Sequence, residues 1–477
     1  MSNRQHALSE PNQARASRPG NLAEQAGWGP RVRRSGLAIV SGIFMAVIFA
    51  PLEWAWWSWF GLVPLLLLAC RPVSSPLWLG LGYGMGHFTF AFGWIREVFL
   101  LAPVGVALIC AWFPALWAWF CACLLRYLSM EEQHDTLGSD PTVAIPSRLT
   151  EARQCAFVLL AAAAWVALEW VRGWIFTGLP WDLLGVSQWQ NGLLILLTRW
   201  TGAWGLSFLI VAVNATVFLL IFKPDSRLHG FRRTRATPAM TAILLGSTVI
   251  GLALWRPTTA LPAPDHSVRI ATIQGNIPQS RVWSEEQLQL AITVYTQLTR
   301  EIVASDPPEL VLWPETAIPA SLLYQEECRA ALPPMFAEIQ TPLLAGSLDY
   351  RLAPPRSNEE PRAVNSALLF DRNGIPRAHY DKVHLVPFGE FVPFERHLPW
   401  LVDWIGMGRG LLPGREYTIF SFGEHARFGV NICYEDIFPE ISANFVRRGA
   451  NLLVTLTNDA WFGETSGSRQ HFAHSVI

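Results

Sequence analysis

Three residues in the second half of the chain carry side chains that could together perform acyl transfer. Glu315 stands just past the short apolar run 310–313. Cys433 follows the run 428–432, and Lys382 lies at the end of a third predicted strand. A thiolate is a strong nucleophile, a nearby carboxylate can take the thiol proton, and an ammonium can stabilise a developing oxyanion. This set could therefore transfer an acyl group through a thioester.

Each of these residues also has an ordinary structural explanation. A cysteine after an apolar strand is more often a buried filler, and a single lysine is usually solvated. A glutamate after Trp-Pro is more often a turn or helix-cap carboxylate. Two further acidic residues, Glu390 and Glu435, could simply pair with Lys382 or Arg409. The hypothesis therefore depends on the three residues occurring together.

The segments that must position these residues alternate between strands and helices. Residues 268–274 alternate and are β-branched, which is typical of a strand, and 284–304 has the apolar repeat of an amphipathic helix. Further strands are predicted at 310–313, 343–347, 366–370, 378–384, 427–432 and 451–456, and further helices at 321–339 and 437–447. This alternation predicts an α/β domain whose parallel strands carry functional groups at their C-terminal ends.

The first half of the chain has a different composition. Hydrophobic residues make up 51% of the chain and charged residues only 15%, and the apolar runs lie almost entirely before residue 256. A helix needs about 20 mostly apolar residues to cross the hydrocarbon core of a bilayer. We therefore predict seven membrane-spanning helices, at 36–51, 54–70, 76–95, 102–126, 154–175, 195–222 and 239–256. A formal net charge of -1 gives no electrostatic reason to expect nucleic acid binding.

Basic residues predict the orientation of these helices. Arg31, Arg33 and Arg34 precede the first helix, and the loop after the sixth is also basic. The positive-inside bias places both segments in the cytoplasm. Seven crossings then put the second half outside, which in a Gram-negative cell is the periplasm. The predicted domains are a disordered cytoplasmic tail (1–35), a membrane domain (36–256) and a periplasmic catalytic domain (266–477).

The cysteines fit this division. Cys328 and Cys433 lie in the predicted outer domain, where two thiols could form a disulfide. We expect Cys433 to stay free, because the chemistry above needs a thiol. The remaining cysteines lie in or beside the predicted membrane helices and are interpreted as small apolar fillers. No Cys/His spacing indicates a zinc site.

Longer stretches around these residues resemble a known superfamily. Residues 274–279, 313–317, 382–393 and 433–435 are similar to the carbon–nitrogen hydrolases, or nitrilases, which use a Glu-Lys-Cys triad. With the predicted membrane helices, residues 169–174 and 178–181 resemble the apolipoprotein N-acyltransferase family. The resemblance begins near residue 36. It implies a polytopic α-helical membrane domain followed by an α/β, nitrilase-like α-β-β-α sandwich domain.

The resemblance also implies roles for individual residues. Glu315 would be the general base, Lys382 the oxyanion stabiliser and Cys433 the nucleophile. The expected supporting and substrate-binding residues are Glu390, Tyr434, Glu435 and Trp283, the last on a mobile region near the lipid entrance.

The reaction that the resemblance implies is a ping-pong transfer. Cys433 would take an acyl chain from a phospholipid, with phosphatidylethanolamine as the expected donor. The thioester would then pass the chain to the α-amine of the diacylglyceryl cysteine of an apolipoprotein, the last step of lipoprotein maturation. No cofactor or metal is expected, and the enzyme would act as a monomer in the bacterial inner membrane. Members of the family continue past the position of Ile477, so we expect this chain to lack the family's C-terminal end.

Two other functions stay open. A membrane-tethered amidase or hydrolase of the nitrilase type would share the triad but give the acyl group to water. The segments 169–174 and 178–181 favour the transferase instead. An inactive lipid-binding scaffold would need no triad, so the presence of Glu315, Lys382 and Cys433 argues against it.

Overall fold

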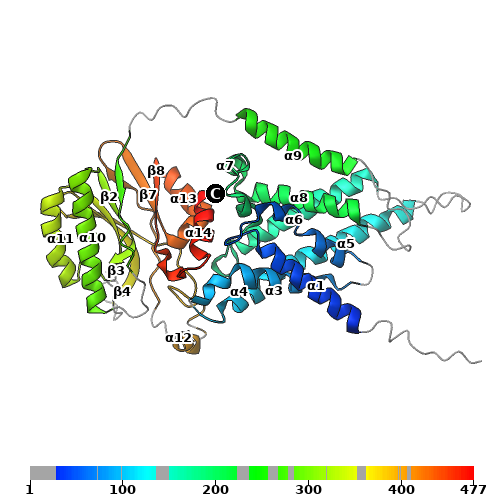
Figure 1. Cartoon of the computed structure of the whole chain (residues 1–477), viewed down its shortest axis with the longest axis horizontal. Coiled ribbons are helices and arrows are strands. Elements are labelled where there is room, and N and C mark those ends of the chain that lie inside the picture. Colours follow the sequence, from blue (N-terminus) through cyan, green and yellow to red (C-terminus); the bar gives the residue numbers. More distant parts are fainter. Residues whose placement is uncertain are drawn as a thin grey trace, which may run out of the picture.

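A computed structural model describes most of the chain as a helical bundle followed by an α/β domain (Figure 1). The described residues are 28–71, 74–97, 99–135, 150–222, 236–255, 267–277, 284–318, 320–351, 361–395, 397, 399–405 and 410–477. Residues 1–27 of the predicted disordered tail (1–35) lie outside the described residues. From Trp28 the chain is helical, earlier than the predicted start at residue 36.

The helices of the first half are mostly apolar. They are α1 (Trp28–Ala46), α2 (Val63–Ala69), α3 (Pro76–Ala91), α4 (Ala102–Cys110), α5 (Trp112–Asp135), α6 (Glu151–Arg172), α7 (Thr198–Thr201), α8 (Ala203–Ile221) and α9 (Ala236–Trp255). Among the described residues, 3 helical stretches are long and apolar enough to cross a membrane: Ala102–Ser129, Glu151–Arg172 and Ala203–Ile221. Ala55–Ala69 and Thr237–Gly251 are shorter apolar helices. The chain is a membrane protein, and its seven crossings stay a prediction.

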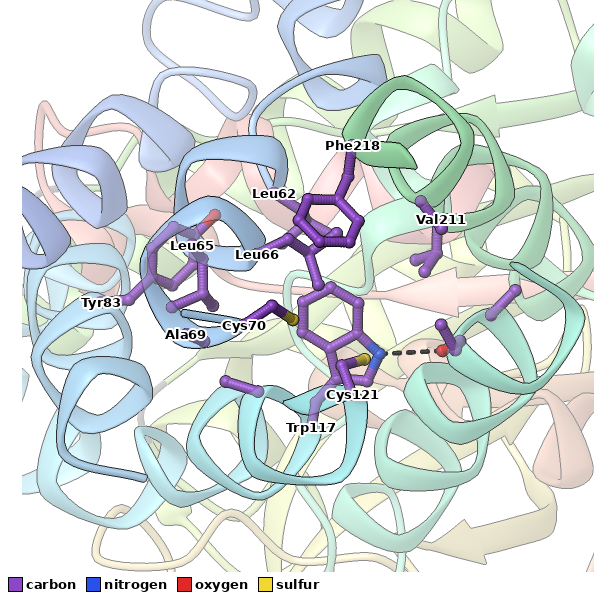
Figure 2. Packing of buried hydrophobic residues seen from close by; sticks show 14 of the residues in the cluster. Leu62, Leu65, Leu66, Ala69, Cys70, Tyr83, Trp117, Cys121, Val211 and Phe218 are labelled. Atoms are coloured by element: carbon purple, nitrogen blue, oxygen red, sulfur yellow. Dashed lines mark hydrogen bonds between the residues drawn. The ribbon is translucent and has the colours of Figure 1, made fainter. Parts of the chain in front are cut away.

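The core of the bundle is formed by α1, α2, α3, α5, α6 and α8, and Figure 2 shows part of it. Trp117 of α5 is fully buried and donates its indole N–H to the carbonyl oxygen of Ala161 on α6, at 2.8 Å. Helices in lipid approach closely where small residues meet. A Cβ at Gly80 of α3 would lie 2.4 Å from the Cα of Ala115 on α5. Glycine is therefore required for this helix pair to pack as it does.

The second half contains two β-sheets. The strands are β1 (Ile270–Thr272), β2 (Leu310–Ile318), β3 (Leu343–Arg351), β4 (Arg362–Phe370), β5 (Pro376–Asp381), β6 (Phe420–Phe422), β7 (Ala426–Ile432) and β8 (Leu452–Leu456). The first sheet has the order β1-β2-β3-β4-β5, with β1, β2 and β3 parallel and β4 and β5 antiparallel to their neighbours. The second has the order β6-β7-β8, in which β7 and β8 run parallel.

Helices cover the outer faces of the two sheets (Figure 1). On the first sheet they are α10 (Glu285–Ser305) and α11 (Glu326–Ile339), and on the second α13 (Pro439–Arg447) and α14 (Gly467–Val476); α12 (Pro399–Ile405) lies apart. Side chains alternate along a strand, so Val311 and Trp313 pack under the helices, whereas Leu310 and Leu312 belong to the cluster between the sheets. This α-β-β-α order confirms the predicted fold class.

Helix α14 connects the α/β domain to the membrane bundle. Gln470 is 2% exposed, and its Oε1 accepts hydrogen bonds from the indole N–H groups of Trp94 at 2.8 Å and Trp181 at 3.0 Å. Its Nε2 donates to the carbonyl oxygens of Ala50 and Ala91, at 3.2 and 3.1 Å. One amide thus satisfies four buried polar groups of the first half of the chain.

Replacing Gln470 by leucine is expected to lower the free energy of unfolding by at least about 2 kcal/mol. The substitution leaves two indole N–H groups and two carbonyl oxygens buried without their partner, and each such group costs about 1–3 kcal/mol. Thermal unfolding in detergent, followed by tryptophan fluorescence, measures the change. Ser468→Ala, at a half-buried position of the same helix, is the control. Equal melting temperatures for the two variants would contradict this role of Gln470.

Candidate active site

Cys433 lies at a sharp turn at the end of β7. The chain passes there from the strand into the short 3-10 helix η6 (Cys433–Ile437). Its φ of 52° is in the left-handed region, which is uncommon for a residue other than glycine. Strained backbone of this kind persists where its surroundings fix it, and it is concentrated at functional sites. The turn places Cys433, a half-buried residue, at the carboxyl ends of the parallel strands β7 and β8.

Glu315 lies in an irregular stretch of β2. The predicted strand stops before Pro314, but β2 continues to Ile318, with a shift of register between Trp313 and Ile318. The prediction that the strand ends before Pro314 was wrong. A proline has no N–H to donate to a neighbouring strand, but a β-bulge does not need that hydrogen bond and so tolerates it. On the neighbouring strand β3, a Cβ at Gly346 would lie 2.6 Å from the Cα of Glu315. Glycine therefore allows the bulge that positions Glu315.

Lys382 follows β5 and is 1% exposed, which is unusual for a lysine. Its Nζ lies 3.0 Å from Oε2 of Glu390 and 3.6 Å from Oε1 of Glu315. Burial alone would lower the pKa of Lys382, but the carboxylates of Glu390 and Glu315 outweigh this effect and raise it above the ordinary value. Lys382 is therefore a fixed ammonium at neutral pH.

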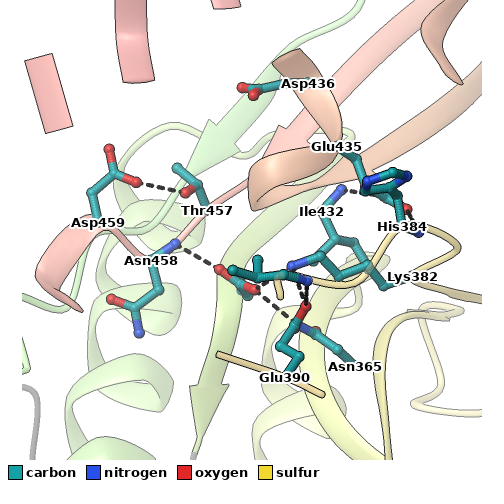
Figure 3. Close-up of polar contacts among 12 residues, drawn as sticks. Asn365, Lys382, His384, Glu390, Ile432, Glu435, Asp436, Thr457, Asn458 and Asp459 are labelled. Atoms are coloured by element: carbon teal, nitrogen blue, oxygen red, sulfur yellow. Dashed lines mark hydrogen bonds and ion pairs between the residues drawn. The ribbon is translucent and has the colours of Figure 1, made fainter. Parts of the chain in front are cut away.

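An asparagine joins the two carboxylates that face Lys382. Nδ2 of Asn365, on β4, donates to Oε1 of Glu315 at 2.7 Å and to Oε1 of Glu390 at 2.8 Å (Figure 3). The backbone N–H of Asn458 donates to the other oxygen of Glu315, at 3.1 Å. Sequence reasoning missed Asn365. The sequence feature that could have identified it is an amide in the middle of a buried strand, because a buried polar side chain needs a hydrogen-bond partner.

The thiol of Cys433 interacts electrostatically with both other members of the predicted triad. Burial raises its pKa well above the ordinary value, and the negative charge of Glu315 acts in the same direction. The ammonium of Lys382 lowers it, but by less. The thiol therefore rests protonated and needs a base before it can attack. The structure brings Glu315, Lys382 and Cys433 together, with the carboxylate of Glu315 and the ammonium of Lys382 both acting on the thiol.

Glu435 holds the backbone around the site in place. It is fully buried, and Oε1 accepts hydrogen bonds from the hydroxyl of Tyr380 at 2.9 Å and the N–H of Val383 at 2.7 Å. Oε2 accepts from the N–H of Ile432 at 2.8 Å. Burial raises the pKa of Glu435 to about 7. These bonds tie the end of β7 to the segment that follows Lys382.

Tyr434 connects the site to the membrane domain. Its hydroxyl donates to the carbonyl oxygen of Gly178 at 3.1 Å, and its ring stacks on Trp181, with centroids 6.5 Å apart. Part of the segment 178–181, singled out in the sequence, therefore contacts the turn that begins at Cys433. Trp283, the remaining predicted site residue, lies outside the described residues.

His471 of α14 is a further residue beside Cys433, and sequence reasoning missed it. The ring is 2% exposed, with Nδ1 2.9 Å from Oδ1 of Asp459 and Nε2 2.9 Å from Oδ1 of Asp436. Polar atoms of Cys433, Asp459 and His471 all lie within 4.8 Å of one another. Both ring nitrogens face carboxylates, which suits an imidazolium that donates twice, whereas a metal ligand needs a free lone pair. No local pattern marks His471, because its contacts are purely tertiary.

The charge of His471 predicts a pH dependence of stability. Burial lowers its pKa, but the hydrogen bonds to Asp436 and Asp459 outweigh burial and raise the pKa from 6.5 to about 10. Its contribution to stability is therefore complete below pH 6.5 and is lost as the pH rises to about 10. Over this interval the melting temperature of the wild type should fall more than that of His471→Gln. Parallel curves would contradict a charged His471.

A cavity of about 30 Å³ lies in the membrane domain and not at Cys433. Glu169, Arg172 and Asp182 line it, and all three are buried. Nη2 of Arg172 donates to the carbonyl oxygen of Asp182 at 3.4 Å, and the indole N–H of Trp165 donates to Glu169 at 2.8 Å. The volume has room for about two water molecules. The charged residues at 169–174 thus belong partly to the interior of the bundle.

Two sequence families match the two halves of the chain. The carbon-nitrogen hydrolase family matches residues 269–476, and the apolipoprotein N-acyltransferase N-terminal domain matches residues 41–216. The class is therefore a carbon–nitrogen hydrolase domain joined to a membrane domain.

Individual relatives narrow this class. The apolipoprotein N-acyltransferase of Geobacter metallireducens is 30% identical over 455 residues, which cover 92% of this chain and 80% of the relative. That of Azotobacter vinelandii is 32% identical over 464 residues, with 91% and 79% covered. The chain belongs to the apolipoprotein N-acyltransferase family. Among solved structures, an amidase from Nesterenkonia sp. is 21% identical, with a TM-score of 0.29 over 40% of this chain and 64% of the amidase.

Proposed function

We propose that this protein moves an acyl chain from a phospholipid to the α-amine of the diacylglyceryl cysteine of an apolipoprotein, through a thioester on Cys433. Membership of the apolipoprotein N-acyltransferase family supports the overall reaction. The observation that carries the mechanism is the buried ammonium of Lys382, held by Glu315 and Glu390 and coupled to the Cys433 thiol.

The first half-reaction forms the thioester. Glu315 accepts the proton of the Cys433 thiol, and the thiolate attacks the ester carbonyl carbon of the phospholipid. The ammonium of Lys382 stabilises the oxyanion of the tetrahedral intermediate. When the intermediate collapses, the ester C–O bond breaks and Glu315 returns the proton to the departing alkoxide. The products are a lysophospholipid and an S-acyl Cys433.

The second half-reaction forms the amide. The free α-amine of the acceptor attacks the thioester carbonyl carbon, and Lys382 again stabilises the oxyanion. Glu315 accepts a proton from the attacking nitrogen. Collapse then breaks the C–S bond, and the Cys433 thiolate takes the proton back from Glu315. The enzyme returns to its starting state without a change of oxidation state, so the chemistry needs no redox partner.

The position of the catalytic domain follows from where the substrates are. Both substrates are anchored in the membrane, so we place residues 266–477 on the periplasmic face of the inner membrane and residues 36–256 within it. We also propose that the protein acts as a monomer. Large apolar side chains on the segment after Lys382 support contact with lipid, because Phe388, Phe394 and Trp400 are all exposed. Phosphatidylethanolamine is the proposed donor.

The experiment that tests this function separates transfer from hydrolysis. The purified protein is placed in vesicles of phosphatidylethanolamine with an isotope-labelled acyl chain, and a synthetic diacylated lipopeptide with a free N-terminal cysteine amine is added. Labelled N-acyl lipopeptide is the expected product. Labelled free fatty acid alone would indicate a membrane-tethered hydrolase, and neither product from folded protein would indicate a lipid-binding scaffold. Glu315→Gln, which keeps the size of the side chain but removes the base, is the control that should form neither.

A further inference from the structure

His471 links the catalytic turn to two other parts of the fold. Its two ring nitrogens hold Asp436, on η6, and Asp459, at the start of the 3-10 helix η7 (Asp459–Phe462). From the membrane domain, Trp181 stacks on the imidazole, with ring centroids 5.5 Å apart and an angle of 20° between the planes. The ring is thus fixed on its edges by carboxylates and on a face by an indole.

Charged groups from several elements face the sulfur of Cys433. Glu315 of β2 and Lys382 after β5 belong to the proposed catalytic machinery. Asp459 and His471 add a negative and a positive group whose polar atoms lie within 4.8 Å of the sulfur and of each other. A carboxylate at this distance disfavours a thiolate, so Asp459 alone would oppose the activation of Cys433.

We propose that His471 is a positioning residue for the acyl transfer, which holds Asp459 and Asp436 in place and offsets the negative charge of Asp459 at the Cys433 sulfur. The inference rests on the proposed role of Cys433 as the nucleophile. His471 cannot itself be the base, because an imidazolium bound to a carboxylate at each nitrogen has no free lone pair.

The groups around His471 support this assignment. Asp436 is fixed on its far side by the hydroxyl of Ser475, which donates to Oδ2. His474, one turn further along α14, accepts a hydrogen bond from the N–H of Asp182 at 3.0 Å. Burial lowers the pKa of His474 to about 3, so it carries no charge at neutral pH. His471 is therefore the charged histidine of this helix.

The test measures the reactivity of Cys433 as a function of pH. Full-length protein in detergent is treated with iodoacetamide between about pH 6 and 10, and alkylation is followed by mass spectrometry of the peptide that contains Cys433. Because iodoacetamide reacts with the thiolate, the pH at which alkylation reaches a set rate reports how readily the thiol ionises. The variants are His471→Gln, Asp459→Asn, the double variant, and Asp436→Asn as the matched control on the other side of the ring.

In His471→Gln, the pH for the set rate should rise by at least about one unit, because Asp459 then faces the sulfur without its counter-charge. Asp459→Asn should lower the pH for the set rate by more than Asp436→Asn does. In the double variant, which combines His471→Gln with Asp459→Asn, this pH should return toward the wild-type value. If the double variant stays as slow as His471→Gln, the loss of reactivity does not come from the charge of Asp459, and the proposal is overturned. If His471→Gln does not fold, equal effects of Asp459→Asn and Asp436→Asn would overturn it. Alkylation needs no lipid, so failure of the proposed function would be seen separately in the vesicle assay.

Discussion

Replacing Cys433 by alanine is expected to reduce the rate of acyl transfer by at least about 10⁴-fold, because loss of the nucleophile removes the covalent route altogether. No other thiol among the described residues can substitute. The second cysteine of the catalytic domain, Cys328, is fully buried in α11 and belongs to the cluster under the first sheet. The rate is measured as labelled N-acyl lipopeptide formed in phosphatidylethanolamine vesicles.

The matched control for this prediction is Cys328→Ala. It removes a thiol from the same domain, so a general effect of cysteine loss would appear in both variants. We expect Cys328→Ala to keep the rate within a few-fold of the wild type, with a lower melting temperature because a buried side chain is shortened. Transfer by Cys433→Ala within tenfold of the wild type would contradict the assignment of the nucleophile.

Replacing Lys382 by methionine is expected to affect both rate and stability. The rate should fall by about 10²–10³-fold, which is the typical effect of losing one group that stabilises an oxyanion. The free energy of unfolding should fall by about 3–5 kcal/mol, because Glu315 and Glu390 are left facing each other without the buried ammonium between them. Vesicle assays and thermal unfolding measure the two effects on the same preparation.

A double variant separates the two effects of losing Lys382. In Lys382→Met with Glu390→Gln, one of the two uncompensated carboxylates becomes a neutral amide, so part of the stability should return. The rate should stay as low as in the single variant, because no group replaces the ammonium at the oxyanion. Recovery of the rate together with stability would indicate that Lys382 only maintains the fold.

Sequence patterns predicted much of the catalytic domain because its elements obey local rules. The run before Cys433 was expected to be a strand over 427–432 and is observed as Ala426–Ile432, since alternating and β-branched residues suit a pleated, buried surface. The same reasoning placed Lys382 at a strand end, directly after Pro376–Asp381. The same reasoning predicted the end of β2 wrongly, because the strand contains a bulge and continues beyond Pro314.

In the membrane domain, hydropathy predicted the apolar segments but not where their helices break. The predicted helix over 195–222 is interrupted at Gly202, whose φ of 62° is outside the helical region, and α8 begins only at Ala203. The predicted helix over 54–70 is a 3-10 turn at Ala55–Trp59 followed by the short α2. Mean apolarity does not register such breaks, because backbone dihedral angles depend on individual residues and their packing.

The residues that sequence reasoning missed meet the site only through tertiary structure. Asn365 and His471 are far along the chain from Glu315 and Cys433, and neither lies in a motif that carries chemistry by itself. Their roles became visible from the partners of their polar atoms, which are carboxylates in both cases.

The most direct test of the account is the mass of the intact protein after incubation with phosphatidylethanolamine and no acceptor. The account predicts a mass increase of one acyl chain that hydroxylamine removes, that is absent from Cys433→Ala, and that is discharged into the N-acyl product when the diacylated lipopeptide is added. If folded protein makes N-acyl lipopeptide at the full rate but never carries an acyl chain on Cys433, the transfer does not pass through a thioester and the central claim is wrong.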